Sequence, residues 1–133
     1  MTTTYEPPEG CRDVLAIVGS VKFVTPGAMD QAREIILGVF ARRRPDAVVS
    51  GGADGIDTLG VELADAAGIE TIVHPPKVKQ WAGLGGYRDR NLLIALDCTR
   101  LLRIVCHASK TYGSGWTADQ AEKQGKVVWR VTL

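Results

Sequence analysis

Short continuous apolar runs alternate along the chain with longer segments in which apolar residues recur at every third or fourth position. A short run such as Val14–Val18, followed by Gly19 and Ser20, is typical of a strand that is buried on both faces. Five such runs predict strands, at residues 14–18, 46–49, 70–74, 101–106 and 126–131.

Helical spacing and terminal signals between these runs predict four helices. Thr25 and Pro26 are the residue types expected of an N-cap and of a first helical position, and Pro45 ends that segment. The fourth helix is expected to open on a capping box that starts at Thr117 and to end near Gly125. The helices are predicted to follow the strands one by one, over about residues 26–44, 56–67, 88–97 and 117–125.

The strict alternation of strand and helix predicts an α/β fold. We expect a single-domain, Rossmann-like three-layer sandwich in which about five parallel strands carry helices on both faces. Residues 13–133 are expected to form this domain, and residues 1–12 a flexible N-terminal lead-in. Because ligands of open parallel sheets bind beyond the carboxyl ends of the strands, the residues that follow each strand are the candidates for function.

Composition narrows the class of protein. The chain has 133 residues, 45% of them apolar and 23% charged, which suits one globular domain. A net charge of +1 gives no sign of binding to DNA or membranes by bulk charge, and no apolar run approaches the roughly 18 residues of a membrane span. Three widely spaced cysteines, without a secretory signal, indicate a cytoplasmic protein. With two histidines and no cysteine pair at ligand spacing, we expect no metal and no cofactor.

The stretch SGGADGID follows the second predicted strand and covers Ser50–Asp57. Its glycines permit either a compact turn or the close approach of a ligand to bare backbone, and the N-terminus of the next helix attracts anions. An inward-pointing Asp57 would repel a phosphate, so we expect it either to cap the second helix or to accept a hydrogen bond from a ribose hydroxyl. The candidate phosphate-binding residues of this turn are Ser50, Gly51, Gly52 and Ala53.

A second glycine-rich turn, YGSGWT, precedes the fourth predicted helix. Its backbone N–H groups and hydroxyls would face the same edge of the sheet, from Gly113, Ser114, Gly115 and Thr117. Neither turn matches the P-loop pattern GxxxxGK[ST], and the first strand is not followed by GxGxxG. Both absences argue against an ATPase and against an ordinary dinucleotide-dependent dehydrogenase.

Charged and aromatic residues fall at the same edge of the predicted sheet. Arg88 and Arg90 would neutralise phosphate while Asn91 reads a base or ribose; the alternative is a solvated first turn of the third helix. His74 and His107 end strands, and either is a general base or a structural, hydrogen-bonded residue. Four aromatic residues offer either base stacking or loop packing: Trp81, Tyr87, Tyr112 and Trp116.

Three motifs, SGGADGID, YRDRN and YGSGWTADQA, come in the order and spacing of the SLOG superfamily of Rossmann-like domains, which the chain resembles from about Val14 to Val131. That superfamily includes the LOG cytokinin-activating phosphoribohydrolases, the molybdenum-cofactor carrier proteins and the Rossmann domain of the DprA/Smf DNA-processing proteins. Gly19, Ser20 and Trp81 look most like the small YspA/YpsA-related branch. The resemblance implies a pocket for a small phosphorylated nucleotide derivative, lined by Gly19, Ser20 and residues of the three motifs, in a homodimer or higher homo-oligomer.

The chain also departs from the LOG pattern PGGxGTxxE, since Trp116 stands between glycine and threonine and Gln120 replaces the glutamate. A neutral amide cannot act as a general base, so the leading hypothesis is a protein that senses, carries or processes a nucleotide derivative. One alternative is a LOG-like nucleotide hydrolase with a shifted carboxylate, at Asp54, Asp57 or Asp119. The other is a DprA-like domain for single-stranded DNA, and because the net charge gives it no support, a nucleic-acid partner is not expected.

Overall fold

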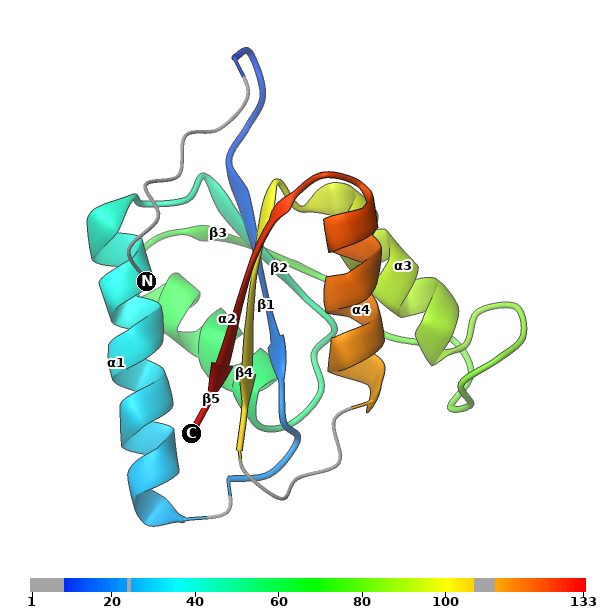
Figure 1. The fold of residues 1–133 in the computed structure, drawn as a ribbon, viewed down its shortest axis with the longest axis horizontal. Helices are drawn as coiled ribbons and strands as arrows, with labels where there is room; N and C mark the ends of the chain where they lie inside the picture. The colour runs from blue at the N-terminus through cyan, green and yellow to red at the C-terminus, as the bar shows by residue number, and fades with distance from the viewer. Residues whose placement is uncertain (1–8, 24, 107–111) are drawn as a thin grey trace.

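The computed structural model describes residues 9–23, 25–106 and 112–133. Within these ranges five parallel strands alternate with four helices, as the apolar pattern predicts (Figure 1). The strands are β1 (Val14–Gly19), β2 (Ala47–Ser50), β3 (Glu70–Val73), β4 (Arg100–Val105) and β5 (Val127–Thr132). The helices are α1 (Pro26–Arg42), α2 (Ile56–Ala66), α3 (Tyr87–Asp97) and α4 (Tyr112–Lys123). None of them is both long and apolar enough to cross a membrane.

The sheet has the strand order β3-β2-β1-β4-β5. The chain adds β2 and β3 on one side of β1 and then returns to the other side for β4 and β5, so the order reverses between β1 and β4. The carboxyl ends of these two strands mark the point where doubly wound folds bind their ligands. The predicted Rossmann-like α/β fold is confirmed.

Two helical layers cover the sheet, α1 and α2 on one face and α3 and α4 on the other (Figure 1). Alternate residues of β1 serve the two layers: Leu15 and Ile17 pack toward α1 and α2, whereas Ala16 and Val18 pack toward α3 and α4. Because both faces of this strand are buried, its sequence is a continuous apolar run rather than an alternating one.

The helix starts confirm one prediction and correct another. Thr25 caps α1, and its hydroxyl accepts a hydrogen bond from the Ala28 N–H at 3.2 Å. The capping box predicted at Thr117 is wrong, because α4 already begins at Tyr112. The Thr117 hydroxyl donates to the Gly113 carbonyl at 2.8 Å, which is a bond to the preceding turn of the same helix. The glycine-rich turn expected before α4 is therefore its first turn, where packing against α3 outweighs the low helix propensity of glycine.

A buried ion pair closes the sheet at the opposite edge, where the amino ends of the strands lie. Arg100 donates from Nε to Asp13 Oδ1 at 3.1 Å and from Nη2 to Asp13 Oδ2 at 2.8 Å. The Arg100 side chain is 2% exposed and that of Asp13 is 4% exposed. Arg100 Nη2 also donates to the Arg43 carbonyl at 2.8 Å, so this guanidinium joins β1, β4 and the end of α1.

We expect Asp13→Ala to lower the free energy of unfolding by about 3–5 kcal/mol, because it leaves a buried guanidinium without its counter-charge. Urea denaturation measures the loss. The matched control is Glu70→Ala, which removes the exposed partner of Arg12 in the neighbouring ion pair and should cost less than about 1 kcal/mol. Equal, small losses in both variants would mean that water compensates Arg100 as readily as Asp13 does.

Candidate functional site

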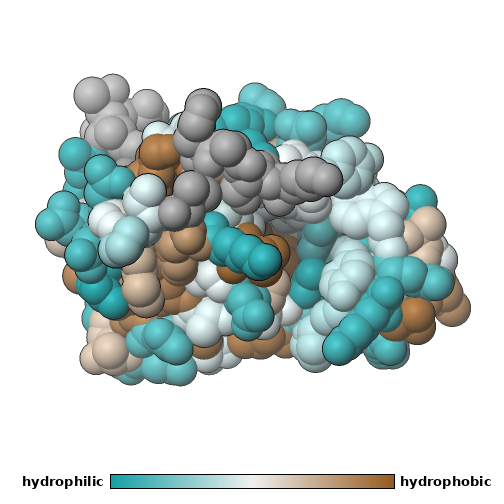
Figure 2. Space-filling model, turned by 90° about the horizontal axis from the view of Figure 1, so that it is seen from below, coloured by the Kyte–Doolittle hydropathy of each residue, from teal (hydrophilic) through white to brown (hydrophobic). Residues whose placement is uncertain are grey.

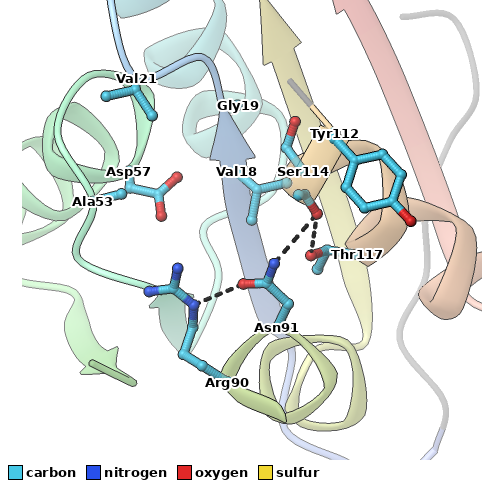
Figure 3. A pocket seen from close by; sticks show the side chains of 11 residues that line it. Val18, Gly19, Val21, Ala53, Asp57, Arg90, Asn91, Tyr112, Ser114 and Thr117 are labelled. Carbon is cyan, nitrogen blue, oxygen red and sulfur yellow. Dashed lines mark hydrogen bonds between the residues drawn. The ribbon is translucent and has the colours of Figure 1, made fainter. Parts of the chain in front are cut away.

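A small cavity opens at the carboxyl edge of the sheet, at the switch point between β1 and β4. Figure 2 looks onto this edge and shows a hollow near its centre, among hydrophilic and apolar side chains. The cavity measures about 120 Å³, well below the roughly 300–1,000 Å³ of pockets that enclose a drug-sized ligand. It is lined by Val18, Gly19, Val21, Ala53, Asp57, Arg90, Asn91, Tyr112, Gly113, Ser114 and Thr117 (Figure 3).

The turn between β2 and α2 wraps its backbone around Asp57. Gly55 is the N-cap of α2 and Asp57 lies inside the first turn, so the expected cap at Asp57 is wrong. The Asp57 carboxylate turns back instead, and its Oδ2 accepts a hydrogen bond from the Gly51 N–H at 3.3 Å. The Ser50 hydroxyl and the Ala53 N–H also favour the ionised carboxylate. The donors of SGGADGID thus serve a carboxylate of the protein itself.

Two glycines of this turn are required by contacts within the protein. A Cβ at Gly51 would collide with the Arg90 guanidinium. Gly55 has a φ of 81°, and a Cβ there would collide with the carbonyls of Ser20 and Val21 in the turn after β1. Close packing of two loops and a buried side chain therefore explains these glycines.

Arg90 connects three segments at the edge of the sheet. Its Nη1 donates to the Gly51 carbonyl at 2.6 Å and to the His74 carbonyl at 3.4 Å, and its Nε donates to Asn91 Oδ1 at 2.7 Å. The guanidinium carbon lies 5.3 Å from the centre of the Tyr87 ring. Arg90 is only 9% exposed, and no described residue accepts a hydrogen bond from its second terminal nitrogen, Nη2.

Asn91 continues this network from α3 to α4. Its Nδ2 donates to the Gly113 carbonyl at 3.3 Å, while its Oδ1 holds Arg90 (Figure 3). The first turn of α4 is placed in this way against the cavity, with the unpaired N–H groups of a helix N-terminus at its start. The Ser114 hydroxyl, which also lines the cavity, accepts a hydrogen bond from Arg103 Nε at 3.0 Å.

The electrostatics of the cavity rest on two opposite charges. Asp57 is 7% exposed, and burial raises its pKa from 3.8 to about 6, although Arg90 and the Gly51 N–H act in the opposite direction. Burial also lowers the pKa of Arg90, opposed by the charge of Asp57. Among the described lining residues these are the only charged ones, and the structure records no hydrogen bond or ion pair between them.

Eight of the candidate residues from the sequence line the cavity, and the others lie around it. Ser20 accepts a hydrogen bond from the Cys106 N–H at 2.8 Å. Ser50 and Gly51 lie outside the lining and donate hydrogen bonds to Asp57. Gly52 and Arg88 are exposed and lie outside the lining. Gly115 borders a second cavity of about 300 Å³, together with Arg103, Tyr112, Trp116 and Asp119.

Val18 and Val21 line the cavity although they were not among the candidates from the sequence, and Tyr112 was one of four aromatic candidates. The sequence signal for Val18 and Val21 is their position at or just after the end of the first predicted strand. The aromatic side chains pack on one another: the Trp81 ring centre is 5.0 Å from that of Tyr112 and 5.5 Å from that of Trp116, both edge-on. This is the loop-packing alternative for Trp81 and Trp116, whereas Tyr112 also lines the cavity.

His74, the one histidine among the described residues, gives no general base at the cavity. His74 Nε2 lies 2.5 Å from Asp97 Oδ2, which is the structural, hydrogen-bonded alternative, and His74 does not line the cavity. His107 lies outside the described residues. Across the described ranges, no three His, Cys, Asp or Glu side chains are grouped so that they would hold a metal ion.

A comparison with protein-family models finds no match, and one with curated proteins likewise finds none. Among solved structures, the chain is similar to the X-ray structure of DNA processing protein A (DprA) from Streptococcus pneumoniae. The TM-score is 0.65 and the identity 21%, over 90% of this chain and 50% of that one, so the chain spans half the length of DprA. This likeness confirms a DprA-like Rossmann fold, whereas the finer resemblance to the YspA/YpsA-related branch stays a prediction.

We expect Asp57→Asn to alter stability in a pH-dependent way. The folded protein holds the Asp57 proton more tightly than the unfolded chain does, so wild-type stability relative to Asp57→Asn falls as the pH rises from about 4 to about 6 and is level above that. The total change is on the order of 3 kcal/mol. Urea unfolding of both proteins at several pH values measures it, and parallel stability curves would show that the Asp57 carboxylate ionises as freely as in the unfolded chain.

Proposed function

We propose that this protein binds a small phosphorylated nucleotide derivative at the carboxyl edge of its sheet. One observation carries the proposal: the buried guanidinium of Arg90 keeps Nη2 without a described acceptor beside a cavity that also borders the first turn of α4. A buried donor of a charged group normally has a partner, so a ligand oxygen is the partner expected here.

The parts of the site have distinct roles in this proposal. The N-terminus of α4, at Gly113 and Ser114, faces the phosphate, because its unpaired N–H groups and helix dipole favour an anion. Arg90 donates to a second ligand oxygen, and Asn91 fixes the position of Arg90 relative to the first turn of α4. The cavity is too small for a whole nucleotide, so the base lies outside it. Assembly into a homo-oligomer stays a prediction.

A second candidate function is hydrolysis of a nucleotide, and the position of one carboxylate favours it. Of the three carboxylates that would take the place of Gln120, Asp54 is exposed and Asp119 pairs with Arg130 at 3.0 Å, whereas Asp57 lines the cavity. A carboxyl group with a pKa of about 6 is suited to general acid–base chemistry near neutral pH. Loss of free base from a bound nucleotide, absent without the protein, would reveal this activity.

The likeness to DprA adds single-stranded DNA as a further ligand to be tested. Its phosphates would occupy the same helix N-terminus, and binding would weaken steeply with salt. Native mass spectrometry with a mixed panel of nucleotides, dinucleotides and short oligonucleotides separates these candidates, since a retained ligand is identified by its mass. The proposal fails if no phosphorylated ligand is retained.

We expect Arg90→Ala to weaken binding of the retained nucleotide by about 1.5–3 kcal/mol, because a charge-assisted hydrogen bond is lost. Titration calorimetry measures the affinity, and thermal unfolding checks that the variant is folded. Arg88→Ala is the matched control, since Arg88 lies on the same turn of α3 but is exposed, and its affinity should equal that of the wild type. If Arg90→Ala binds as tightly as Arg88→Ala, the ligand lies elsewhere.

A further inference from the structure

Asp57 and Arg90 face the same cavity from different helices and carry opposite charges (Figure 3). Both residues are less than one-tenth exposed, yet the structure records neither a hydrogen bond nor an ion pair between their side chains. Buried charges that are left apart are costly, because each has lost its water without gaining its partner. The arrangement therefore calls for something that lies between them.

A single residue keeps the two groups apart. The Gly51 N–H donates to Asp57 Oδ2 at 3.3 Å, and the Gly51 carbonyl accepts from Arg90 Nη1 at 2.6 Å. Arg90 is further held by the His74 carbonyl and by Asn91, and Asp57 by its place in the first turn of α2. Neither side chain approaches the other without breaking one of these bonds, so the separation belongs to the fold.

The chemistry of the pair selects its ligand. An isolated phosphate between them would meet the charge of Asp57, an isolated ammonium would meet that of Arg90, and an apolar group would leave both charges without a partner. A hydroxyl group both donates and accepts. Two neighbouring hydroxyls satisfy both sides, because one donates to the carboxylate while the other accepts from the guanidinium.

We propose that Asp57 and Arg90 together bind the 2′,3′-hydroxyl pair of a ribose, so that the protein selects ribonucleotides. This inference rests on the proposed function and names the sugar of its ligand. The phosphate then lies at the opposite side of the cavity, where Ser114 and Tyr112 are found in Figure 3, away from the charge of Asp57. A cavity of about 120 Å³ encloses only part of such a ligand, and the base lies outside it.

The test compares wild-type affinities for the four common nucleoside 5′-monophosphates with those for their 2′,3′-dideoxy counterparts, by titration calorimetry. The ribose forms should bind at least about tenfold more tightly than the dideoxy forms, since the hydrogen bonds that the dideoxy forms lack are made to charged groups. Equal affinities would overturn this inference and leave the proposed function standing. Failure of both forms to bind, together with retention of no phosphorylated ligand from the mass-spectrometry panel, would overturn the proposed function, and this inference with it.

Asp57→Asn identifies the group responsible. It retains an oxygen for the Gly51 N–H but replaces the charged acceptor, so we expect the ribose preference to shrink several-fold while the dideoxy forms bind at least as well as before. Asp54→Asn is the matched control, because Asp54 is an exposed carboxylate in the same turn, and its preference should remain that of the wild type. An undiminished preference in Asp57→Asn would assign the hydroxyls to another residue.

Discussion

The hydrogen bonds of the Arg90 guanidinium hold together the loops at the carboxyl edge of the sheet. This side chain binds the carbonyls of Gly51 and His74, which belong to the turns after β2 and β3, and through Asn91 it reaches the first turn of α4. The Gly51 and His74 carbonyls lie directly after the last residues of β2 and β3, and they take hydrogen-bond donors from outside these strands. A planar group with five donors supplies them at once, which a lysine could not do. The shape of the cavity is therefore a consequence of one buried cation.

Buried opposite charges are paired at one edge of the sheet and kept apart at the other. At the amino edge, Asp13 and Arg100 meet in a bidentate pair at 2.8 and 3.1 Å, and each charge satisfies the other. At the carboxyl edge, Asp57 and Arg90 are buried to a similar degree but kept apart by Gly51. The first arrangement is complete without a ligand. In the second, Arg90 Nη2 has no acceptor among the described residues. This difference is the physical basis for assigning function to one edge and stability to the other.

The sequence was sufficient for the fold because its apolar pattern has few interpretations. Continuous runs such as Val14–Val18 require burial on both faces, and helical segments between them leave room only for parallel strands. Arg90 was a candidate because arginine at a helix N-terminus is unfavourable without a partner, and Asn91 was a candidate because its amide can bind a base or ribose. The sequence could not show that the hydrogen-bond donors of SGGADGID bind the carboxylate of Asp57 in the same stretch, because that depends on the direction of one side chain. It also misplaced the start of α4, where packing against α3 decides.

The lining of the cavity shows which carboxylate bears on hydrolysis. From the sequence, Gln120 in place of a glutamate argues against hydrolysis, which assumes that residue 120 faces the ligand. Gln120 follows Thr117, which lines the cavity, by about 4.5 Å along the axis of α4, but does not itself line the cavity. Among the described lining residues, Asp57 is the only carboxylate. Binding and hydrolysis therefore depend on the same group. The Asp57 carboxylate either binds the sugar hydroxyls or, from the same position, acts as a general acid–base on the neighbouring glycosidic bond.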